Sequence, residues 1–476
     1  MQKSKARLSH MPAGSSGEEG HGSLSTRELI FIGVGGIIGA GFFLGSGLPI
    51  KMAGPSVLLA FLLGAIVTAQ VTGSLTSIAA NHPVRGSFKV FADMYMGRFA
   101  GFLQGWTYYL TSILTISSEA VAMSVFSKLW FPHIASWILV SVYSAGILVL
   151  NAFGVKNFGK VESIMSVLKI GALAGFIIYL GFFVASRMMG PSATGASPVV
   201  HPLLGPGGGF FPHGFTGLMQ SILIVIFAYA GIGVFGTAAA ELKNPKGIDK
   251  AAWGTVIILA ALYILSIGLL LMIEPWNTVS TKASPFVVAW KDVGLHWVAS
   301  LFNGVVFVSS FSVMTGAVFS AGQILSNLGT TGEAPHFVTK RDRRGVEMWA
   351  LVFTAACIAV AIGASYLLPS NVYSFLVSAS SFFTFFNWFV ILWTFLSWRI
   401  KTDEDNHFLS SLAFGQPIST VVTMLSIIVL TGYALTQHDQ RVGFYFCAAV
   451  FALLSISYVL FARHSKAAAT EDANED

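Results

Sequence analysis

The sequence predicts an all-α polytopic membrane protein with twelve transmembrane helices. They are expected to form a 5+5 inverted repeat with discontinuous helices 1 and 6, followed by two C-terminal helices. Three observations lead to this prediction. The 476 residues are 54% hydrophobic and only 10% charged, whereas soluble proteins carry roughly 25% charged residues. Twelve apolar stretches approach the ~20 residues that cross a bilayer. Two of these stretches, at corresponding positions, are interrupted by glycine.

The twelve stretches are joined by short polar connections. Ser25 and Glu28 fit a capping box, which predicts that the first helix begins just before its glycine-rich part. The expected segments are about 28–50, 55–80, 99–128, 134–152, 162–185, 215–240, 251–273, 297–328, 347–367, 371–398, 417–436 and 442–462. An even number of segments places both termini on the same side of the membrane.

The positive charges predict which side this is. Of 27 lysines and arginines, 20 fall in the tails and loops of one side, 6 fall on the other, and Lys169 lies inside the fifth segment. Short loops rich in Lys and Arg stay in the cytoplasm. Both termini are therefore expected to be cytoplasmic, in a multi-pass protein of the plasma (inner) membrane. The net charge of +6 follows from this bias, and no nucleic-acid partner is expected.

The segments also predict a division of the chain. We expect a disordered cytoplasmic tail (1–24), a first repeat (25–185), an extracellular loop (186–214), a second repeat (215–398), two last helices (399–462) and a cytoplasmic tail (463–476). No cleavable signal pattern is expected at the N-terminus. Cys357 and Cys447 both fall in apolar segments, which argues against a disulfide framework and a metal site.

The first segment holds the densest glycine stretch of the chain. From Phe31 to Gly47, FIGVGGIIGAGFFLGSG, seven of seventeen residues are glycine. Glycine inside a helix costs ~1 kcal/mol relative to alanine, so we expect the helix to unwind near Gly39–Gly41. Broken backbone in a membrane is tolerated where it lines a cavity or is buried in protein. The freed amides and carbonyls are suited to bind a small zwitterion. Close helix packing of small residues is the alternative.

The sixth segment contains a second glycine-rich break, Phe227-Ala-Tyr-Ala-Gly231-Ile-Gly233-Val-Phe-Gly236. It opens the second set of five segments, as the first break opens the first set. Glycine-interrupted segments at corresponding positions of two halves are the best sequence indication of a transporter site. Two matched breaks therefore favour a binding site over packing alone.

Four motifs, in order, resemble the amino acid–polyamine–organocation (APC) superfamily, specifically the bacterial amino acid permeases. The resemblance covers segments 1 to 10. The motifs are GGIIGAGFFLGSG (35–47), NHPVRGSFKVFADMYMGRFAGFLQGWTYY (81–109), FAYAGIGVFGTAAAELKNPKG (227–247) and GEAPHFVTKRDRRGV (332–346).

The resemblance implies that the unwound parts of helices 1 and 6 bind the backbone of an amino acid. The N-terminus of the second half-helix would face the substrate carboxylate, because free N–H groups and a positive dipole end favour an anion. Carbonyls near Ile37, Phe227 and Ala230 would take the ammonium, and Phe227 resembles an aromatic gate. The implied substrate-binding residues are Ile37, Ile38, Gly39, Ala40, Gly41, Phe227, Ala228, Ala230 and Gly231.

The chain departs from the family pattern at two positions. Relatives often carry Ser or Thr where Ala40 stands, so one hydroxyl contact is absent. Many carry an acid where Gly233 stands, which puts a proton role for helix 6 in doubt.

Two charged residues fall inside predicted segments, and such residues are functional candidates by default. In the family, a lysine in the context of Lys169 replaces a sodium ion between helices 1, 5 and 8, which suggests proton rather than sodium coupling. The alternative is that Lys169 snorkels to the inner interface. Glu119 could accept a proton, bind a substrate side chain or hold a neighbouring helix. Hydroxyls of segment 8, among them Ser309 and Ser312, keep sodium coupling open.

The sequence thus predicts a secondary active amino acid transporter, or permease. The expected mode is proton-coupled uptake of a neutral or hydrophobic L-amino acid by alternating access. The alternatives are an amino acid or amine exchanger of the same fold, uptake of cationic amino acids if Glu119 faces the pocket and, remotely, a polytopic membrane enzyme or receptor. No catalytic residues, metal or cofactor are expected. Sodium is less favoured than a proton gradient as the driving force. The expected partners are the amino acid and membrane lipid, and the sequence does not indicate the oligomeric state.

Overall fold

The computed structural model describes residues 25–82, 87–153, 158–189, 200–201, 203, 209–239, 242, 247–342, 346–367, 372–402 and 407–472. These residues form helices and connections, with no β-strand among them. Residues 1–24 of the expected N-terminal tail and 473–476 of the expected C-terminal tail (463–476) lie outside the described residues, whereas residues 463–472 of that tail continue the last helix instead.

The helices follow the predicted segments closely. The first segment is split into α2 (Thr26–Ile37), α3 (Ala40–Phe43) and α4 (Gly47–Ala53), and the sixth into α10 (Gly214–Phe227) and α11 (Ile232–Ala239). The other ten are α5 (Val57–Asn81), α7 (Arg98–Ser127), α8 (Ser136–Ala152), α9 (Phe158–Met189), α12 (Ile248–Ile273), α14 (His296–Thr330), α15 (Met348–Leu367), α16 (Val372–Lys401), α17 (Ile418–Ala434) and α18 (His438–Asp472).

Short helices connect these elements. The 3₁₀ turn η1 (Gly54–Ser56) precedes α5, and η3 (His336–Thr339) follows α14. Two further helices, α6 (Ser87–Met96) and α13 (Pro285–Asp292), lie in regions where the sequence predicted only loops. The predicted capping box is confirmed: Ser25 Oγ accepts the Glu28 N–H, and the Glu28 carboxylate accepts the Ser25 N–H.

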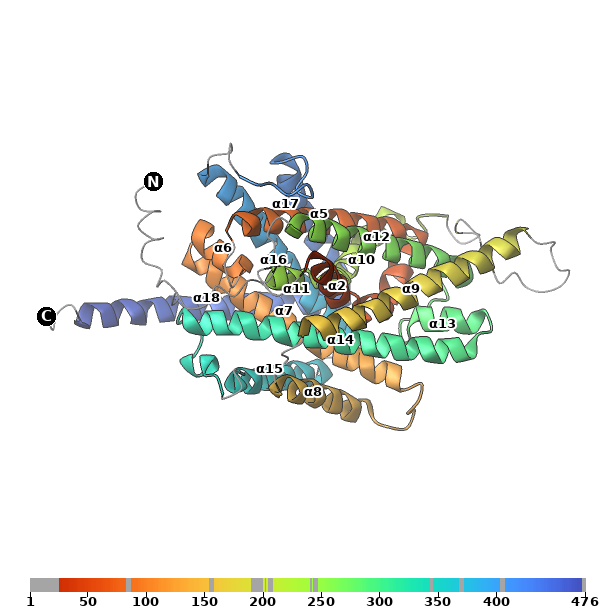
Figure 1. The fold of residues 1–476 in the computed structure, drawn as a ribbon, viewed down its shortest axis with the longest axis horizontal. Helices are drawn as coiled ribbons and strands as arrows, with labels where there is room; N and C mark the ends of the chain where they lie inside the picture. The colour runs from red at the N-terminus through yellow and green to blue at the C-terminus, as the bar shows by residue number, and fades with distance from the viewer. Residues whose placement is uncertain are drawn as a thin grey trace.

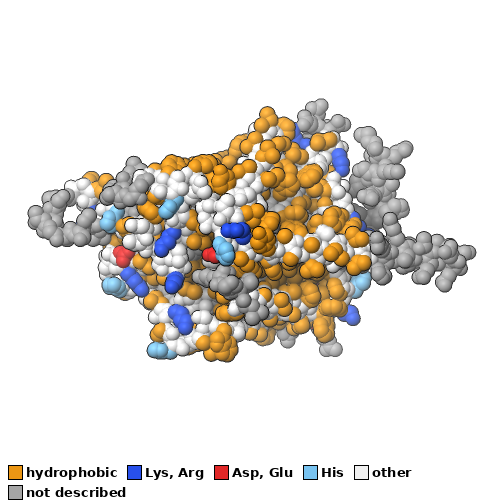
Figure 2. Space-filling model, turned by 180° about the vertical axis from the view of Figure 1, so that it is seen from behind, with side chains coloured by type: hydrophobic (Ala, Val, Ile, Leu, Met, Phe, Trp, Pro, Cys, Tyr) orange, Lys and Arg blue, Asp and Glu red, His pale blue; other side chains and the backbone are white. Residues whose placement is uncertain are grey.

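The surface and the helix lengths are those of an integral membrane protein. In the described part of the chain, seven helical stretches are long and apolar enough to cross a bilayer, and four apolar helices are shorter. Large apolar side chains point outward, such as Ile178 at 72% and Phe182 at 74% exposure on α9. Figure 2 shows a broad hydrophobic area between two ends where the visible charged side chains gather. Such a surface suits lipid rather than water.

The broken helices lie at the centre of the bundle. Figure 1 shows α2 and α11 surrounded by longer helices, while α8 and α15 pack together at one edge. The long helix α7 packs against both α14 and α16. Side chains from α7 and α14 therefore reach the first break from one side. The end of the molecule that holds α6 and η3 is called the α6 end, and the opposite end, which holds α13, is called the α13 end.

A buried ion pair closes the α6 end. Lys89 on α6 is fully buried, and its Nζ lies 2.8 Å from Glu333, in the turn that follows α14. Arg98 at the start of α7 lies 3.3 Å from the same carboxylate. The Trp106 indole N–H donates to the Glu333 carbonyl at 3.1 Å. Glu333 thus ties α6 and α7 to the end of α14.

A buried carboxyl lies at the α13 end. Glu274 caps α12 outside the apolar span, and one of its oxygens is buried with no hydrogen-bond partner among the described residues. Burial, together with the neighbouring Asp292, raises the pKa of Glu274 to about 7. The loop that follows packs on the first broken helix, because Ser284 Oγ donates to the Phe43 carbonyl at 2.7 Å.

This carboxyl is expected to make the loop pH-sensitive. Because the pKa is raised, the stabilising contribution of Glu274 is complete below its ordinary value of 4.5 and is lost as pH rises through about 7. Amides of residues 275–284 should show lower hydrogen-exchange protection factors at pH 8 than at pH 5.5. The Glu274→Gln variant should show equal protection at both. An unchanged pH effect in that variant would assign the effect to another group.

Candidate functional site at two helix breaks

The first break is a two-residue extended segment. The backbone of Ile38 is extended, with φ −72° and ψ 104°, and Gly39 follows with φ −143° and ψ −159°. Helix α3 then restarts at Ala40. The break separates α2 from α3 where the glycine density predicted it. Its groups find partners from elsewhere in the chain: Ser309 Oγ on α14 donates to the Ile38 carbonyl at 2.7 Å, and Tyr373 Oη on α16 donates to the Ala40 carbonyl at 3.0 Å.

The second break lies between α10 and α11 and faces the first. The end of α10 tightens into i→i+3 turns, in which the Ala230 N–H donates to the Phe227 carbonyl at 3.1 Å. Glycine is required at 231, because a methyl group there would lie 2.4 Å from the Gly36 carbonyl oxygen. At 41 a methyl group would lie 2.8 Å from the ring of Phe227. Small residues thus let the two breaks touch. The helix break and the close packing, which the sequence offered as alternatives, occur together here.

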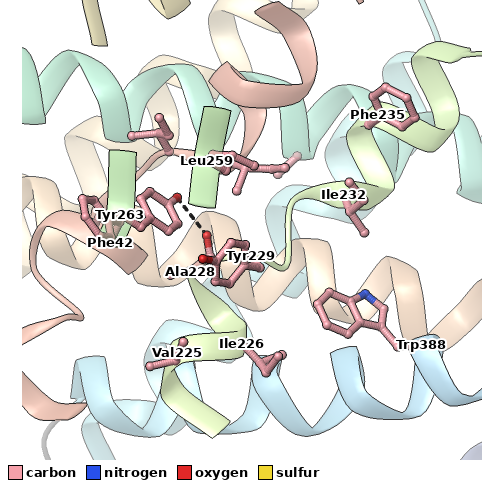
Figure 3. Close-up of a cluster of buried hydrophobic side chains, with 14 of the residues drawn as sticks. Phe42, Val225, Ile226, Ala228, Tyr229, Ile232, Phe235, Leu259, Tyr263 and Trp388 are labelled. Carbon is pink, nitrogen blue, oxygen red and sulfur yellow. Dashed lines mark hydrogen bonds between the residues drawn. The ribbon is translucent and has the colours of Figure 1, made fainter. Parts of the chain in front are cut away.

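A second connection between the two breaks is made by aromatic side chains. The Tyr263 hydroxyl on α12 donates to the Ala228 carbonyl at 3.0 Å, drawn as the dashed line in Figure 3. The same ring stacks on Phe42 of α3, with centroids 3.8 Å apart and planes 11° from parallel. Tyr263 therefore holds α3 and the end of α10 in one unit, and the Ala228 carbonyl is occupied.

A small cavity lies where the breaks meet. About 40 Å³ of it admits the centre of a water-sized molecule, and a single water needs roughly 10–15 Å³ by that measure. The cavity is therefore small in this conformation, with room for only a few waters. Its lining residues are Gly36, Ile37, Gly41, Tyr108, Thr111, Ser112, Thr115, Glu119, Phe227, Ala230, Gly231, Val313 and Ala317.

The structure brings together five of the nine expected substrate-binding residues at this cavity: Ile37, Gly41, Phe227, Ala230 and Gly231. The other four, Ile38, Gly39, Ala40 and Ala228, do not line it. The carbonyls of Ile38 and Ala228 accept the Ser309 and Tyr263 hydroxyls, and the Ala40 amide is covered by a carboxylate. The break lies where it was expected, but neighbouring side chains already form hydrogen bonds with some of its free amide and carbonyl groups.

The cavity wall formed by α7 is more polar than the sequence suggested, since Thr111, Ser112 and Thr115 line it. Each hydroxyl also has a protein partner: Thr111 donates to the Thr107 carbonyl, Ser112 donates to the Tyr108 carbonyl and Thr115 pairs with Ser380. Hydroxyls in membrane helices commonly bond their own backbone in this way. They leave lone pairs that can accept a hydrogen bond from a ligand.

Glu119 lies at the break itself. Its carboxylate accepts the Ala40 N–H with both oxygens, at 3.1 and 3.0 Å, and its side chain is buried. A methyl group on Gly39 would lie 2.6 Å from the same carboxylate. Glu119 also lines the cavity. Glu119 therefore contacts the pocket, and it is held there by the Ala40 amide with the Ser310 hydroxyl of α14 beside it.

Lys169 is fully buried between α2, α9 and α14. Its Nζ donates to the Gly35 carbonyl at 2.5 Å and to Ser312 Oγ at 2.7 Å, and it lies 3.7 Å from Glu162. Ser312 in turn donates to Glu162 at 2.6 Å. The ammonium thus connects the three helices that the resemblance implied. The Lys169 side chain is enclosed by protein and does not reach the surface of the molecule.

Two residues of this region had not been assigned to it from the sequence. Glu162 lies near the start of α9, and the turn of that helix directs its carboxylate toward Lys169 and Ser312. Tyr108 had no assignment, and it fills the space beside Gly233, where a methyl group would lie 2.3 Å from its ring and hydroxyl. The sequence did contain one indication of this contact. Position 233 is glycine, which departs from the family pattern and leaves room for a large neighbouring side chain.

Comparisons of the sequence with known proteins show the family of the chain. The profile of the family described as "Amino acid permease" matches residues 28–470. The aromatic amino acid transport protein AroP of Escherichia coli K12 is 30% identical over 452 residues, covering 95% of this chain and 98% of that protein.

Two relatives come from Bacillus subtilis. The uncharacterized amino acid permease YtnA is 30% identical over 472 residues, covering 96% of this chain and 98% of the relative. The uncharacterized transporter YcgH is 30% identical over 440 residues, covering 92% and 95%. The match of the profile and of these relatives extends over nearly the whole chain, so the chain belongs to the amino acid permease family of the APC superfamily.

Proposed function

We propose that this protein is a secondary active transporter that takes up a neutral, hydrophobic L-amino acid together with protons. The observation that carries the proposal is the meeting of two helix breaks at one cavity, with Phe227 against Gly41. Broken helices at the contact of two halves are where transporters of this type bind their substrates. The substrate backbone is held by main-chain groups of the breaks, and Phe227 covers it.

Phe227 is placed to act as a gate. Its side chain lines the cavity and packs with an apolar cluster formed by Ile224, Val377, Leu48 and Tyr373. A rotation of this one side chain would open the cavity without disturbing the stack of Tyr263 on Phe42. Opening is required for loading, because the cavity has room for only a few waters.

The substrate class is inferred from the lining and from one relative. Phe227, Ile37, Val313 and Ala317 supply apolar contacts, and AroP is by its name an aromatic amino acid transport protein. The polar wall of α7 admits a side chain that donates a hydrogen bond, such as a phenol or a hydroxyl. Uptake of cationic amino acids is the second candidate, because the Glu119 carboxylate lines the same cavity.

Proton coupling is proposed for Lys169 and Glu119. The Lys169 ammonium donates to a carbonyl of α2 and to a hydroxyl of α14, and it occupies a place that a metal cation could otherwise fill. An ammonium that gains and loses a proton can make and break these bonds during the cycle. This arrangement favours protons over sodium as the driving ion.

The membrane arrangement completes the proposal. The ten long helices and the two broken ones are taken to cross the membrane twelve times, as a 5+5 inverted repeat followed by α17 and α18. Both termini are cytoplasmic in a plasma membrane, and the domains are bounded as given above. The α6 end is then the inner end, where Lys89 and Glu333 form the inner closure. One helix bundle rocks against the rest to open each end in turn. The protein has no enzymatic role in this proposal.

The proposal is tested by uptake into proteoliposomes of a panel of radiolabelled amino acids. Each amino acid is assayed with an imposed pH gradient, with a sodium gradient, with neither, and with unlabelled amino acid inside. We expect accumulation of one or more neutral hydrophobic amino acids with the pH gradient. A requirement for internal amino acid would assign exchange. Accumulation only with sodium would overturn proton coupling, and no uptake by folded protein would overturn the function.

A further inference from the structure

We propose that Glu119 is an internal competitor of the substrate: its carboxylate occupies the Ala40 amide in the empty protein, and the substrate carboxylate must displace it. The inference rests on the proposed function, in which main-chain groups of the breaks hold the substrate backbone, and it takes the amide at the start of α3 as the partner of the substrate carboxylate. A residue of α7, 79 positions away in the sequence, already fills that place with the same chemical group.

The contacts of Glu119 are those of a bound carboxylate. Both oxygens are within 3.1 Å of the Ala40 nitrogen, a methyl group on Gly39 would lie 2.6 Å from one of them, and the side chain lines the cavity. A hydrogen bond from a backbone N–H to an ionised oxygen is roughly twice as strong as one between neutral groups. A second carboxylate cannot share this N–H at the same time, because like charges at this distance repel strongly in a low-dielectric interior.

Among the described residues near Glu119, the buried Ser310 hydroxyl on α14 has no hydrogen-bond partner of its own, but it is a neutral donor and cannot balance the charge of a displaced carboxylate. The titratable groups that interact with Glu119 are Lys169 on α9, Tyr263 on α12 and Tyr373 on α16. Lys169 already donates to Gly35 and Ser312, Tyr263 to Ala228, and Tyr373 to Ala40. A displaced Glu119 carboxylate therefore takes up a proton from the water of the open side. One proton is bound for each substrate bound, and the substrate itself drives this step.

The competition has a measurable consequence. The apparent affinity for the substrate is proportional to the fraction of protein in which Glu119 leaves the site free. Removing the Glu119 charge should therefore tighten the binding of an amino acid, whereas a residue that contacts the substrate or only supports the fold would weaken it. Because binding takes up a proton, the affinity of the wild type should increase as pH falls, by at most about tenfold per pH unit.

The experiment measures equilibrium binding of tritiated L-phenylalanine and L-leucine to the purified full-length protein. It uses the wild type, Glu119→Gln and Glu119→Ala between pH 5.5 and 8.5. Phenethylamine, which lacks the carboxylate of phenylalanine, serves as the matched ligand. Glu162→Gln serves as the matched variant, because it removes another buried carboxylate that does not touch Ala40. Thermal unfolding reports whether each variant is folded, and Glu119→Gln keeps an acceptor for the Ala40 N–H if Glu119→Ala does not fold.

We expect both Glu119 variants to bind the amino acid about fivefold or more tightly than the wild type at pH 7.5, without pH dependence. Binding of phenethylamine and the behaviour of Glu162→Gln should show no such gain. Equal or weaker amino acid binding by folded Glu119→Gln, with binding by the wild type intact, overturns the competition and leaves the proposed function standing. Absence of binding to every protein, wild type included, overturns the proposed function and this inference together.

Discussion

Uptake driven by a pH gradient is expected to disappear when Lys169 is replaced by alanine. The ammonium of Lys169 links the Gly35 carbonyl next to the first break with Ser312 on α14, and its loss removes the group that the proposed coupling protonates. It also leaves Glu162 as a buried carboxylate without its cation, and breaking such a pair costs about 3–5 kcal/mol. The measurement is initial-rate uptake in proteoliposomes, together with thermal unfolding of the purified variant.

The two effects of this substitution are separated by a second variant. Lys169→Met combined with Glu162→Gln removes both charges while keeping the volume of the side chains close to the original. Replacing both partners of a buried pair is often neutral for stability. We therefore expect the double variant to unfold near the wild-type temperature and still to fail in gradient-driven uptake. Normal gradient-driven accumulation by the double variant would exclude Lys169 from coupling and leave it a structural role only.

Replacing Gly231 by alanine is expected to impair both substrate binding and stability. The added methyl group would lie 2.4 Å from the Gly36 carbonyl oxygen and 2.9 Å from Ile37, and neither belongs to a long flexible side chain. The two breaks would be pushed apart at the cavity. Overpacking of this kind costs about 1–3 kcal/mol, which corresponds to a roughly 5- to 150-fold loss of affinity if it falls on binding. Equilibrium binding and thermal unfolding measure the two parts.

The matched control is Gly175→Ala on α9. A methyl group there meets no atom within 4 Å, and alanine is favoured over glycine inside a helix by about 1 kcal/mol. This variant should bind and transport as the wild type does, with equal or higher thermal stability. If Gly231→Ala behaved in the same way as Gly175→Ala, the close contact of the two breaks would not be needed for binding.

The sequence predicted the elements of the fold because their signals are local. The capping box of Ser25 and Glu28 and the glycines around Gly39 act within a few residues, and the length of each apolar run reflects the bilayer that it must cross. The helices α6 and α13 were not predicted, because each is short and mixed in composition. Their helical form depends on packing at the ends of the bundle.

The site was predictable only in part, because its contacts join residues that are far apart in the sequence. The position of Lys169 in the fifth segment was evident, but its pairing with Glu162 depends on the turn of α9 that places both toward α2 and α14. The contact of Glu119 with the Ala40 amide joins two helices with no sequence signal in common. The occupation of the space beside Gly233 by Tyr108 is likewise a consequence of tertiary packing.

In the proposed transport cycle, the pair of Lys89 and Glu333 affects how fast the α6 end can open and close. Both charges are fully desolvated at the α6 end, and the cost of desolvation offsets much of their mutual attraction. When the two groups separate, both return to water and regain the hydration free energy that they lost on burial. The ion pair therefore fixes one geometry with little net change in free energy. Dissolved ions shield the separated charges and so favour separation of the pair. Turnover should consequently respond to the ionic strength on that side, and stopped-flow traces at several salt concentrations would measure this response.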